Sequence, residues 1–165
     1  VVAGVNYHGS SGFGHAFQHS IAGRWGELEL QDVEAATDWL ARKPWIDRRR
    51  LFATGGSYGG FMVAWMNAKL PAKRYNAYVC HAGCFDWVGM FAGDAYAGFP
   101  REIGAKYWDD MALVHGQSPH AQLKTLTTPT LVMHGALDYR VPDAQGLAYY
   151  NTLKAQGVPA RLVWF

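Results

Sequence analysis

Leu51-Phe52-Ala53-Thr54-Gly55-Gly56-Ser57-Tyr58-Gly59-Gly60 is the stretch that decides the fold. It places a Gly-x-Ser-x-Gly pattern between a short apolar run and a segment rich in Phe, Met, Val, Ala and Trp. A serine between a strand and a helix lies in a sharp turn, and small neighbours such as Gly55 and Gly59 let the two elements approach each other. The sequence therefore predicts a strand at 50–54, a helix at 57–70, and Ser57 exposed as a nucleophile between them.

The residues around Ser57 supply the other groups that a serine nucleophile needs. The N-terminus of the predicted helix favours developing negative charge, and the backbone amide of Tyr58 can donate to an oxyanion. A plain Gly-rich strand-to-helix turn is the structural alternative. A phosphate-binding loop does not fit, because the stretch has no Gly-Lys-Ser/Thr ending and no lysine near the start of the helix.

The rest of the chain alternates short apolar runs with helical patterns. Strands are predicted at 1–6, 76–81, 130–134 and 160–165, helices at 27–42 and 142–156, and an irregular stretch from 82 to 117. This alternation is typical of α/β proteins, in which a mostly parallel sheet carries helices on both faces. We predict one α/β domain over residues 1–165. Because both terminal segments have the pattern of buried strands, we expect that domain to be incomplete at both ends.

Composition narrows the classes of function. The 165 residues are 50% hydrophobic and 17% charged, which is typical of a globular domain, and a net charge of +2 gives no sign of nucleic acid or a membrane as partner. The three arginines at 48–50 are interpreted as a solvated turn. Cys80 and Cys84 make no disulfide framework, and His15 and His19 have the spacing of a zinc pair but lack a third ligand, so we predict no metal. The compartment, cytoplasmic or periplasmic, and the oligomeric state, a homo-oligomer included, stay open.

A serine nucleophile needs a histidine as base, and the histidine needs a carboxylate. In folds with this serine turn the chain order is Ser, then Asp or Glu, then His. Asp138 follows the strand predicted at 130–134 and is therefore the predicted acid. The alternative is a loop aspartate that caps the next helix, for which Asp143 is an equally good candidate. No histidine follows His134 and none of the seven fits the position of the base, so the triad is incomplete in this chain.

Three further motifs accompany Gly55-Gly-Ser-Tyr-Gly-Gly60. They are Asn6-Tyr-His-Gly-Ser-Ser-Gly-Phe-Gly14, His81-Ala-Gly-Cys-Phe-Asp-Trp-Val-Gly-Met90 and His134-Gly-Ala-Leu-Asp-Tyr-Arg-Val-Pro142. In this order the four motifs resemble the prolyl oligopeptidase family of serine peptidases, in particular its bacterial dipeptidyl-peptidase and acylaminoacyl-peptidase branch. The resemblance covers essentially the whole chain.

The resemblance implies an α/β-hydrolase fold and a peptidase that releases short N-terminal fragments through an acyl-enzyme, with a peptide substrate and without a cofactor. It implies that Ser57 is the nucleophile, Asp138 the acid and the Tyr58 amide an oxyanion donor. The catalytic histidine would lie on a loop just after residue 165, while upstream strands, a second oxyanion donor and a β-propeller would precede residue 1. Residues 1–165 alone are therefore expected to be inactive.

Substrate-binding roles also follow from the resemblance. The predicted lining of the pocket for the side chain before the scissile bond is Tyr58, Cys84, Trp87, Met90 and Val141. Trp87 and Met90 could equally be core residues, and Arg140 could bind a substrate carbonyl or form a surface ion pair. Asp94 and Glu102 are candidates for binding a free α-amino group. The alternatives for the whole protein are a carboxylesterase on the same fold and a non-catalytic α/β scaffold.

Overall fold

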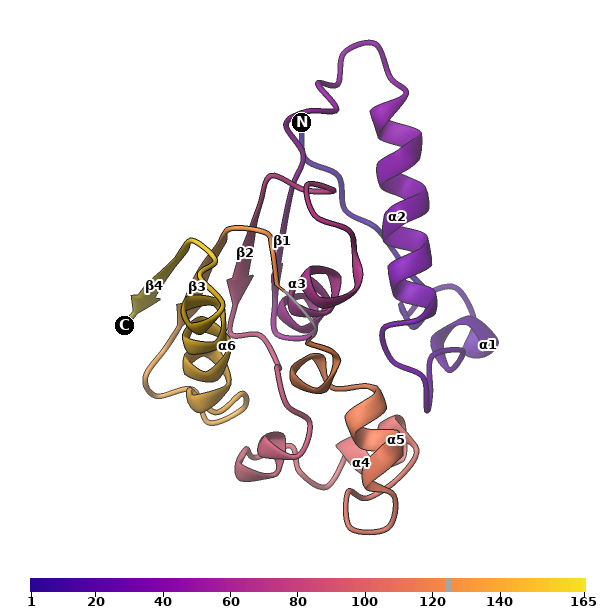
Figure 1. The fold of residues 1–165 in the computed structure, drawn as a ribbon. Coiled ribbons are helices and arrows are strands. Elements are labelled where there is room, and N and C mark those ends of the chain that lie inside the picture. Colours follow the sequence, from indigo (N-terminus) through magenta and orange to yellow (C-terminus); the bar gives the residue numbers. More distant parts are fainter. Residues whose placement is uncertain (124–125) are drawn as a thin grey trace.

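The structure is a computed structural model that describes residues 1–123 and 126–165 (Figure 1). Its secondary structure confirms the predicted alternation of strands and helices. In chain order the elements are α1 (His15–Gln18), α2 (Leu28–Ala41), β1 (Phe52–Gly56), α3 (Tyr58–Lys69), β2 (Ala77–His81), η1 (Gly89–Ala92), α4 (Phe99–Ile103), α5 (Met111–Gly116), η2 (Pro119–Gln122), β3 (Thr130–His134), α6 (Ala144–Ala155) and β4 (Ala160–Trp164).

The four strands form one parallel sheet in the order β1-β2-β3-β4. Parallel neighbours need a crossover, which α3 supplies between β1 and β2 and α6 between β3 and β4. Because all four strands run the same way, their carboxyl ends meet at one edge of the sheet. The loops that leave this edge include Ser57 and Asp138.

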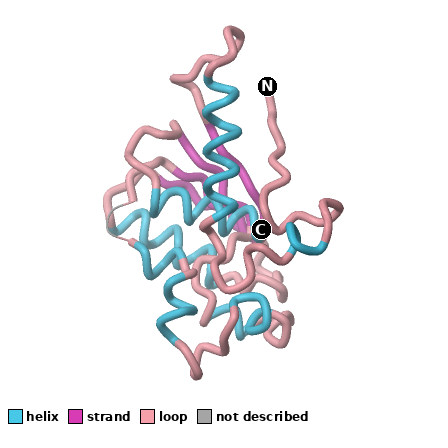
Figure 2. Tube along the Cα trace, turned by 90° about the vertical axis from the view of Figure 1, so that its right-hand side faces the viewer, coloured by secondary structure: helices cyan, strands magenta, loops and turns pink. Residues whose placement is uncertain are grey.

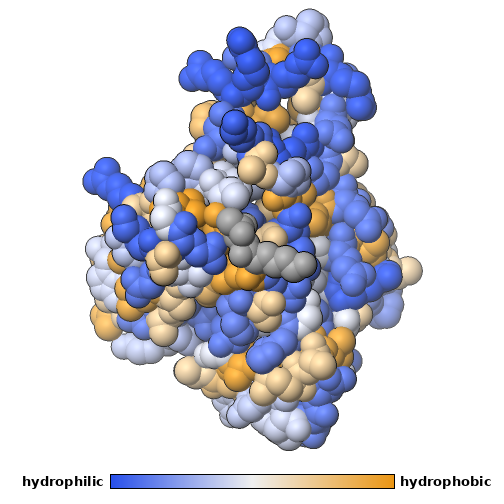
Figure 3. All heavy atoms as spheres, in the orientation of Figure 1, coloured by the Kyte–Doolittle hydropathy of each residue, from blue (hydrophilic) through white to orange (hydrophobic). Residues whose placement is uncertain are grey.

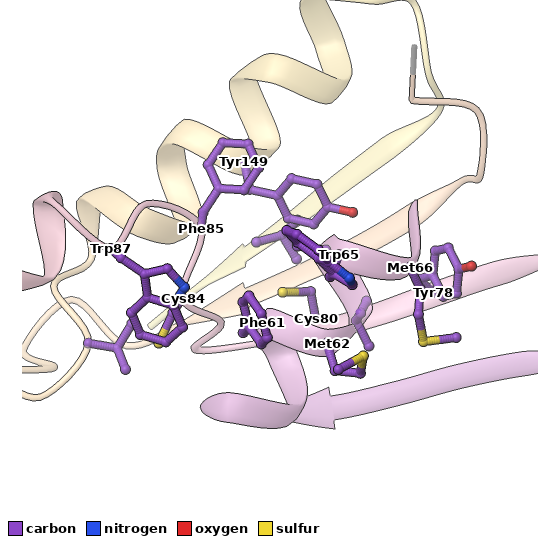
Figure 4. Close-up of a cluster of buried hydrophobic side chains, with 14 of the residues drawn as sticks. Phe61, Met62, Trp65, Met66, Tyr78, Cys80, Cys84, Phe85, Trp87 and Tyr149 are labelled. Carbon is purple, nitrogen blue, oxygen red and sulfur yellow. The ribbon is translucent and has the colours of Figure 1, made fainter. Parts of the chain in front are cut away.

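The core lies between the sheet and the two crossover helices (Figure 4). Alternate residues of β2 and β3, such as Tyr78 and Val132, are buried on that face. Helix α3 is buried over eight successive residues, Gly60 to Asn67, because β1, β2, η2 and α2 pack against it. The amide of Asn67 donates to the hydroxyl of Tyr149 on α6 (2.9 Å), which places both helices on the same face.

Helices cover one face of the sheet in the described residues, where the sequence pattern led us to expect both. On the opposite face of β1, the edge strand, Phe52 is 61% exposed and Thr54 is also exposed. Residues 1–6 were predicted as a strand, and this prediction is wrong in the structure, which shows them extended but unpaired (Figure 2). A strand needs a neighbour for its backbone groups, and no described residue provides one, so Val1 and Val2 are more than 90% exposed.

The stretch predicted as irregular, 82–117, contains three short helical segments, η1, α4 and α5, and η2 follows just after it. None is longer than six residues, which is too short to show a helical period in the sequence. The arginines at 48–50 are exposed in a turn before β1, as predicted. The end of the molecule beyond α2 is largely hydrophilic (Figure 3).

Candidate active site

Ser57 occupies the turn between β1 and α3 with φ of 56° and ψ of −117°. Positive φ is uncommon for a residue with a side chain and costs about 1–3 kcal/mol, so the surrounding contacts must impose it. The amide of Ser57 donates to the carbonyl of His81 at the end of β2 (3.0 Å), and its carbonyl accepts from Phe61 in α3 (3.0 Å). Ser57 is thus tied to both elements, while the residue itself stays exposed.

Two close backbone approaches require glycine around this turn. A Cβ at Gly55 would lie 2.3 Å from the carbonyl oxygen of Gly59, so β1 and α3 could not approach as they do. A Cβ at Gly60 would lie 2.5 Å from the Cα of Gly83, just beyond β2. A Cβ at Gly59 would meet nothing within 4 Å. The predicted role of Gly55 is therefore supported, whereas Gly60, not Gly59, is the second glycine that packing demands.

Tyr58 is the first residue of α3, where the backbone N–H has no partner within the helix. Its amide is therefore available to an oxyanion beside Ser57. The Tyr58 hydroxyl donates to the carboxylate of Glu29, a fully buried residue that the sequence analysis did not select. Burial and the Glu29 carboxylate raise the pKa of Tyr58, so its hydroxyl stays protonated at neutral pH.

Asp138 lies on the loop that follows β3, and its carboxylate is held by the backbone. Its Oδ1 accepts from the amides of Arg140 (3.0 Å) and Val141 (2.9 Å). Oδ2 lies 3.8 Å from Nε2 of His134, which is beyond hydrogen-bond distance. Two amide donors thus fix one oxygen, and Oδ2 can accept a further hydrogen bond. Asp143, the alternative, is the residue before α6, but its side chain makes no capping hydrogen bond there.

His134 is fully buried and contacts the backbone of the loop that carries Asp138. Its Nε2 lies 2.9 Å from the carbonyl oxygen of Val141, so Nε2 carries the proton and donates. Nδ1 has no hydrogen-bond partner in the described chain and packs against Gly146, where an added Cβ would lie 2.5 Å away. His134 therefore supports the loop of Asp138 and is closed to substrate.

The residues predicted to line the substrate pocket are brought together, but mostly below the surface. Cys84, Trp87, Met90 and Val141 are each less than 5% exposed. The Trp87 indole donates to the Gln117 carbonyl (2.8 Å), and its ring centroid is 6.5 Å from that of half-buried Tyr58. These four residues belong to the hydrophobic core, and Tyr58 packs against that core, in agreement with the core alternative for Trp87 and Met90.

Arg140 is on the exposed rim of the loop at 135–143, which carries the predicted acid Asp138 and which we call the acid loop. Its Nε donates to the carboxylate of Asp94 (2.7 Å), and the Asp94 amide donates to the Tyr139 carbonyl (2.9 Å). Both alternatives for Arg140 stay compatible with the structure, because its side chain is 65% exposed while paired. Glu102, the other candidate for an α-amino group, is exposed on α4.

The other candidate groups are the two cysteines and the pair of His15 and His19. Both cysteines are free and buried, and burial raises the pKa of each thiol to about 12. The rings of His15 and His19 are 4.1 Å apart, but no described His, Cys, Asp or Glu completes a group of three around them. None of the helices in the described chain is long and apolar enough to span a membrane.

A parallel sheet with a strained serine between a strand and a helix, and a carboxylate after a later strand, defines the α/β-hydrolase fold. Solved structures agree. Pyrococcus horikoshii acylaminoacyl peptidase superposes with a TM-score of 0.89 at 28% identity, over 97% of this chain and 26% of that chain. A Mycobacterium tuberculosis puromycin-hydrolyzing peptidase superposes with a TM-score of 0.87 at 24% identity, over 97% and 24%, and supports the fold alone.

The sequence profile of the prolyl oligopeptidase family matches residues 1–165, and the chain belongs to that family. Dipeptidyl-peptidase 5 of Porphyromonas gingivalis is 33% identical over 168 residues, which cover 99% of this chain and 24% of the relative. Dipeptidyl-peptidase 5 of Schizosaccharomyces pombe is 30% identical over 167 residues, or 100% and 24%. The chain spans about a quarter of the length of these relatives.

Proposed function

We propose that the full-length protein is a serine peptidase that transfers the N-terminal part of a short peptide to Ser57 and then hydrolyses the acyl-enzyme. The observation that carries the proposal is the turn at Ser57, where strained backbone exposes the residue next to the free amide of Tyr58. Asp138, held by two backbone amides, supplies the acid. Relatives named dipeptidyl-peptidase and acylaminoacyl peptidase support a peptide substrate.

The base in this proposal is a histidine that follows residue 165. Phe165 follows β4 and lies beside the acid loop, where its carbonyl oxygen accepts a hydrogen bond from the Ala136 amide (2.6 Å). Its ring centroid is 6.4 Å from that of His81, whose carbonyl binds the Ser57 amide. With inter-strand spacings of about 4.8 Å, the ends of β1 and β3 are about 10 Å apart. The side chains of Ser57 and Asp138 start from these two ends, so in the proposal an imidazole that hydrogen-bonds to both lies between them. A side chain a few residues beyond Phe165 starts close to that position.

The test is covalent labelling of the full-length protein with a fluorophosphonate probe. We expect Ser57→Ala to abolish labelling while the melting temperature stays close to that of the wild type. Ser11→Ala, at an exposed serine on the loop before α1, is the matched control and should label normally. Labelling of Ser57→Ala at the wild-type rate would place the nucleophile elsewhere, and an unlabelled wild type would favour a non-catalytic scaffold.

The substrate class needs a second experiment, because the serine turn does not distinguish amide from ester hydrolysis. We propose release of dipeptides or acylated amino acids, as the names of the relatives suggest. Dipeptidyl- and N-acetyl-aminoacyl-naphthylamides should be compared with a short acyl ester on the full-length protein. Turnover of the ester alone would support the carboxylesterase alternative.

We also propose that residues 1–165 are the central part of a larger catalytic domain. A groove of about 830 Å³ separates residues 1–5 from β1, and it is lined by apolar side chains such as Val33 and Met62. The outer edge of β1 and the segment at 1–5 pair with no strand in the described residues. Their backbone groups can therefore pair with additional strands of the full-length protein. Residues 1–165 alone should be close to inactive towards a naphthylamide, and turnover equal to that of the full-length protein would show that a histidine within them is the base.

A further inference from the structure

Glu29 is a buried carboxylate on the first turn of α2 that the proposed acyl-enzyme chemistry does not use. It has no exposed area. Its two oxygens accept from the Gly26 amide (3.2 and 3.1 Å), and Oε1 also accepts from the Tyr58 hydroxyl. Burial, with a smaller contribution from Asp32, raises the pKa of Glu29. A carboxylate is costly to bury unless it is hydrogen-bonded, so Glu29 depends on the Gly26 amide and the Tyr58 hydroxyl in this position.

The ring of Tyr58 is confined on several sides. Trp25 meets it edge-on with centroids 5.1 Å apart, Phe61 lies at 5.0 Å, and Tyr7 and Trp87 lie at 6.3 and 6.5 Å. The hydroxyl at the far end of the ring is therefore directed at Glu29. Both ends of Tyr58 are fixed, one by the backbone next to Ser57 and the other by the carboxylate.

We propose that Glu29 is a positioning residue, which holds Tyr58 and through it the oxyanion side of the Ser57 turn. The inference rests on the proposed function, because it concerns the reactivity of Ser57. Without an acceptor, the half-buried hydroxyl must turn towards water, and the ring must leave its place against Trp25. Because Tyr58 is the residue that follows Ser57, this movement displaces the start of α3, and displacements of about 1 Å near reacting atoms reduce rates by about 100-fold.

The same helix provides a matched control. Glu34 accepts a hydrogen bond from the Tyr75 hydroxyl (2.9 Å) and pairs with Arg74 (2.6 Å). Tyr75 lies just before β2, at the amino ends of the strands, whereas Ser57 lies at their carboxyl ends. Loss of this pair should therefore affect stability without affecting Ser57.

The experiment measures the rate of fluorophosphonate labelling, with kcat and KM for one acyl ester, in the full-length protein. We expect Tyr58→Phe and Glu29→Leu each to slow labelling about tenfold or more, with kcat falling more than KM rises. Glu29→Gln should label within about threefold of the wild type, because its amide oxygen can still accept from the Tyr58 hydroxyl. The controls Glu34→Gln and Tyr75→Phe should label at the wild-type rate.

The double variant Glu29→Leu with Tyr58→Phe tests whether the two residues act together. It should label no more slowly than the slower single variant, whereas independent effects would multiply and overturn the proposal. Wild-type labelling of Tyr58→Phe would also overturn it, and this variant removes only one oxygen, so it decides the matter even if Glu29→Leu does not fold. A wild-type protein that is not labelled at all contradicts the proposed function instead.

Discussion

Replacing Gly55 with alanine should disable Ser57 without touching it. The new Cβ would lie 2.3 Å from the carbonyl oxygen of Gly59 and 2.4 Å from its carbonyl carbon. Ordinary contact begins at 3.4 Å, so β1 and α3 would have to separate by about 1.1 Å. Both partners are backbone and no rotamer change can relieve the contact, so we expect a cost of about 3 kcal/mol. A shift of that size at Ser57 should slow fluorophosphonate labelling by about 100-fold.

The matched control is Gly59→Ala, two residues beyond Ser57. Its Cβ would meet nothing within 4 Å, and alanine is favoured over glycine within a helix by about 1 kcal/mol. We expect the control to keep its labelling rate and to melt no lower than the wild type. If Gly55→Ala labelled as fast as Gly59→Ala with an unchanged melting temperature, the contact between β1 and α3 would not determine the position of Ser57.

Four further outcomes can be checked. Asp138→Asn should keep the fold and lower kcat by about 10⁴, and a loss below tenfold would point to another acid. His81→Ala should still label, because the proposed base follows residue 165, and loss of labelling would identify His81 as the base. Cys80 and Cys84, with thiol pKa values of about 12, should react with a disulfide reagent at pH 8 only after denaturation. Because the fold raises the pKa of Glu29, the folded protein favours the protonated carboxyl. The free energy of unfolding, relative to that of Glu29→Gln, should therefore fall as the pH rises above about 4.5. A difference that does not depend on pH would contradict the raised pKa.

Strand positions were predictable where apolar runs end at clear boundaries. β3 lies at Thr130–His134, as predicted. β1 was predicted two residues too early, because Gly55 and Gly56 have the composition of a turn. In the structure these glycines are extended and pair with Cys80 and His81 of β2. Pairing with a distant strand decided their conformation, and the local sequence does not contain that information.

The places of Ser57 and Asp138 in the fold were predictable, because each residue belongs to a motif that follows a strand, and the structure places both after strands of the sheet. Their catalytic roles stay predictions. Glu29 was missed, because an acidic residue in the first turn of a helix usually stabilises the helix end in solvent. Only the fold shows that Gly26 packs against Trp65, where a Cβ would lie 2.5 Å from the indole, and that Tyr58 closes over the carboxylate. The Gly-x-x-Glu spacing is a signal, but a weak one.

Backbone hydrogen bonds connect the loops at the carboxyl edge of the sheet to the neighbouring strands. The Ser57 amide donates to the end of β2, the Ala82 amide donates to Met133 of β3, and the Ala136 amide donates to Phe165 just after β4. Each loop is therefore positioned by the backbone of the next strand, so the distance between Ser57 and the acid loop depends little on the side chains between them. Gly83 is the position at which a side chain would change this distance. A Cβ there would lie 2.5 Å from the Cys80 sulfur and 2.7 Å from the backbone of Gly60. A side chain there would push β2 away from α3, and the displacement would reach Ser57 through the hydrogen bond between its amide and β2.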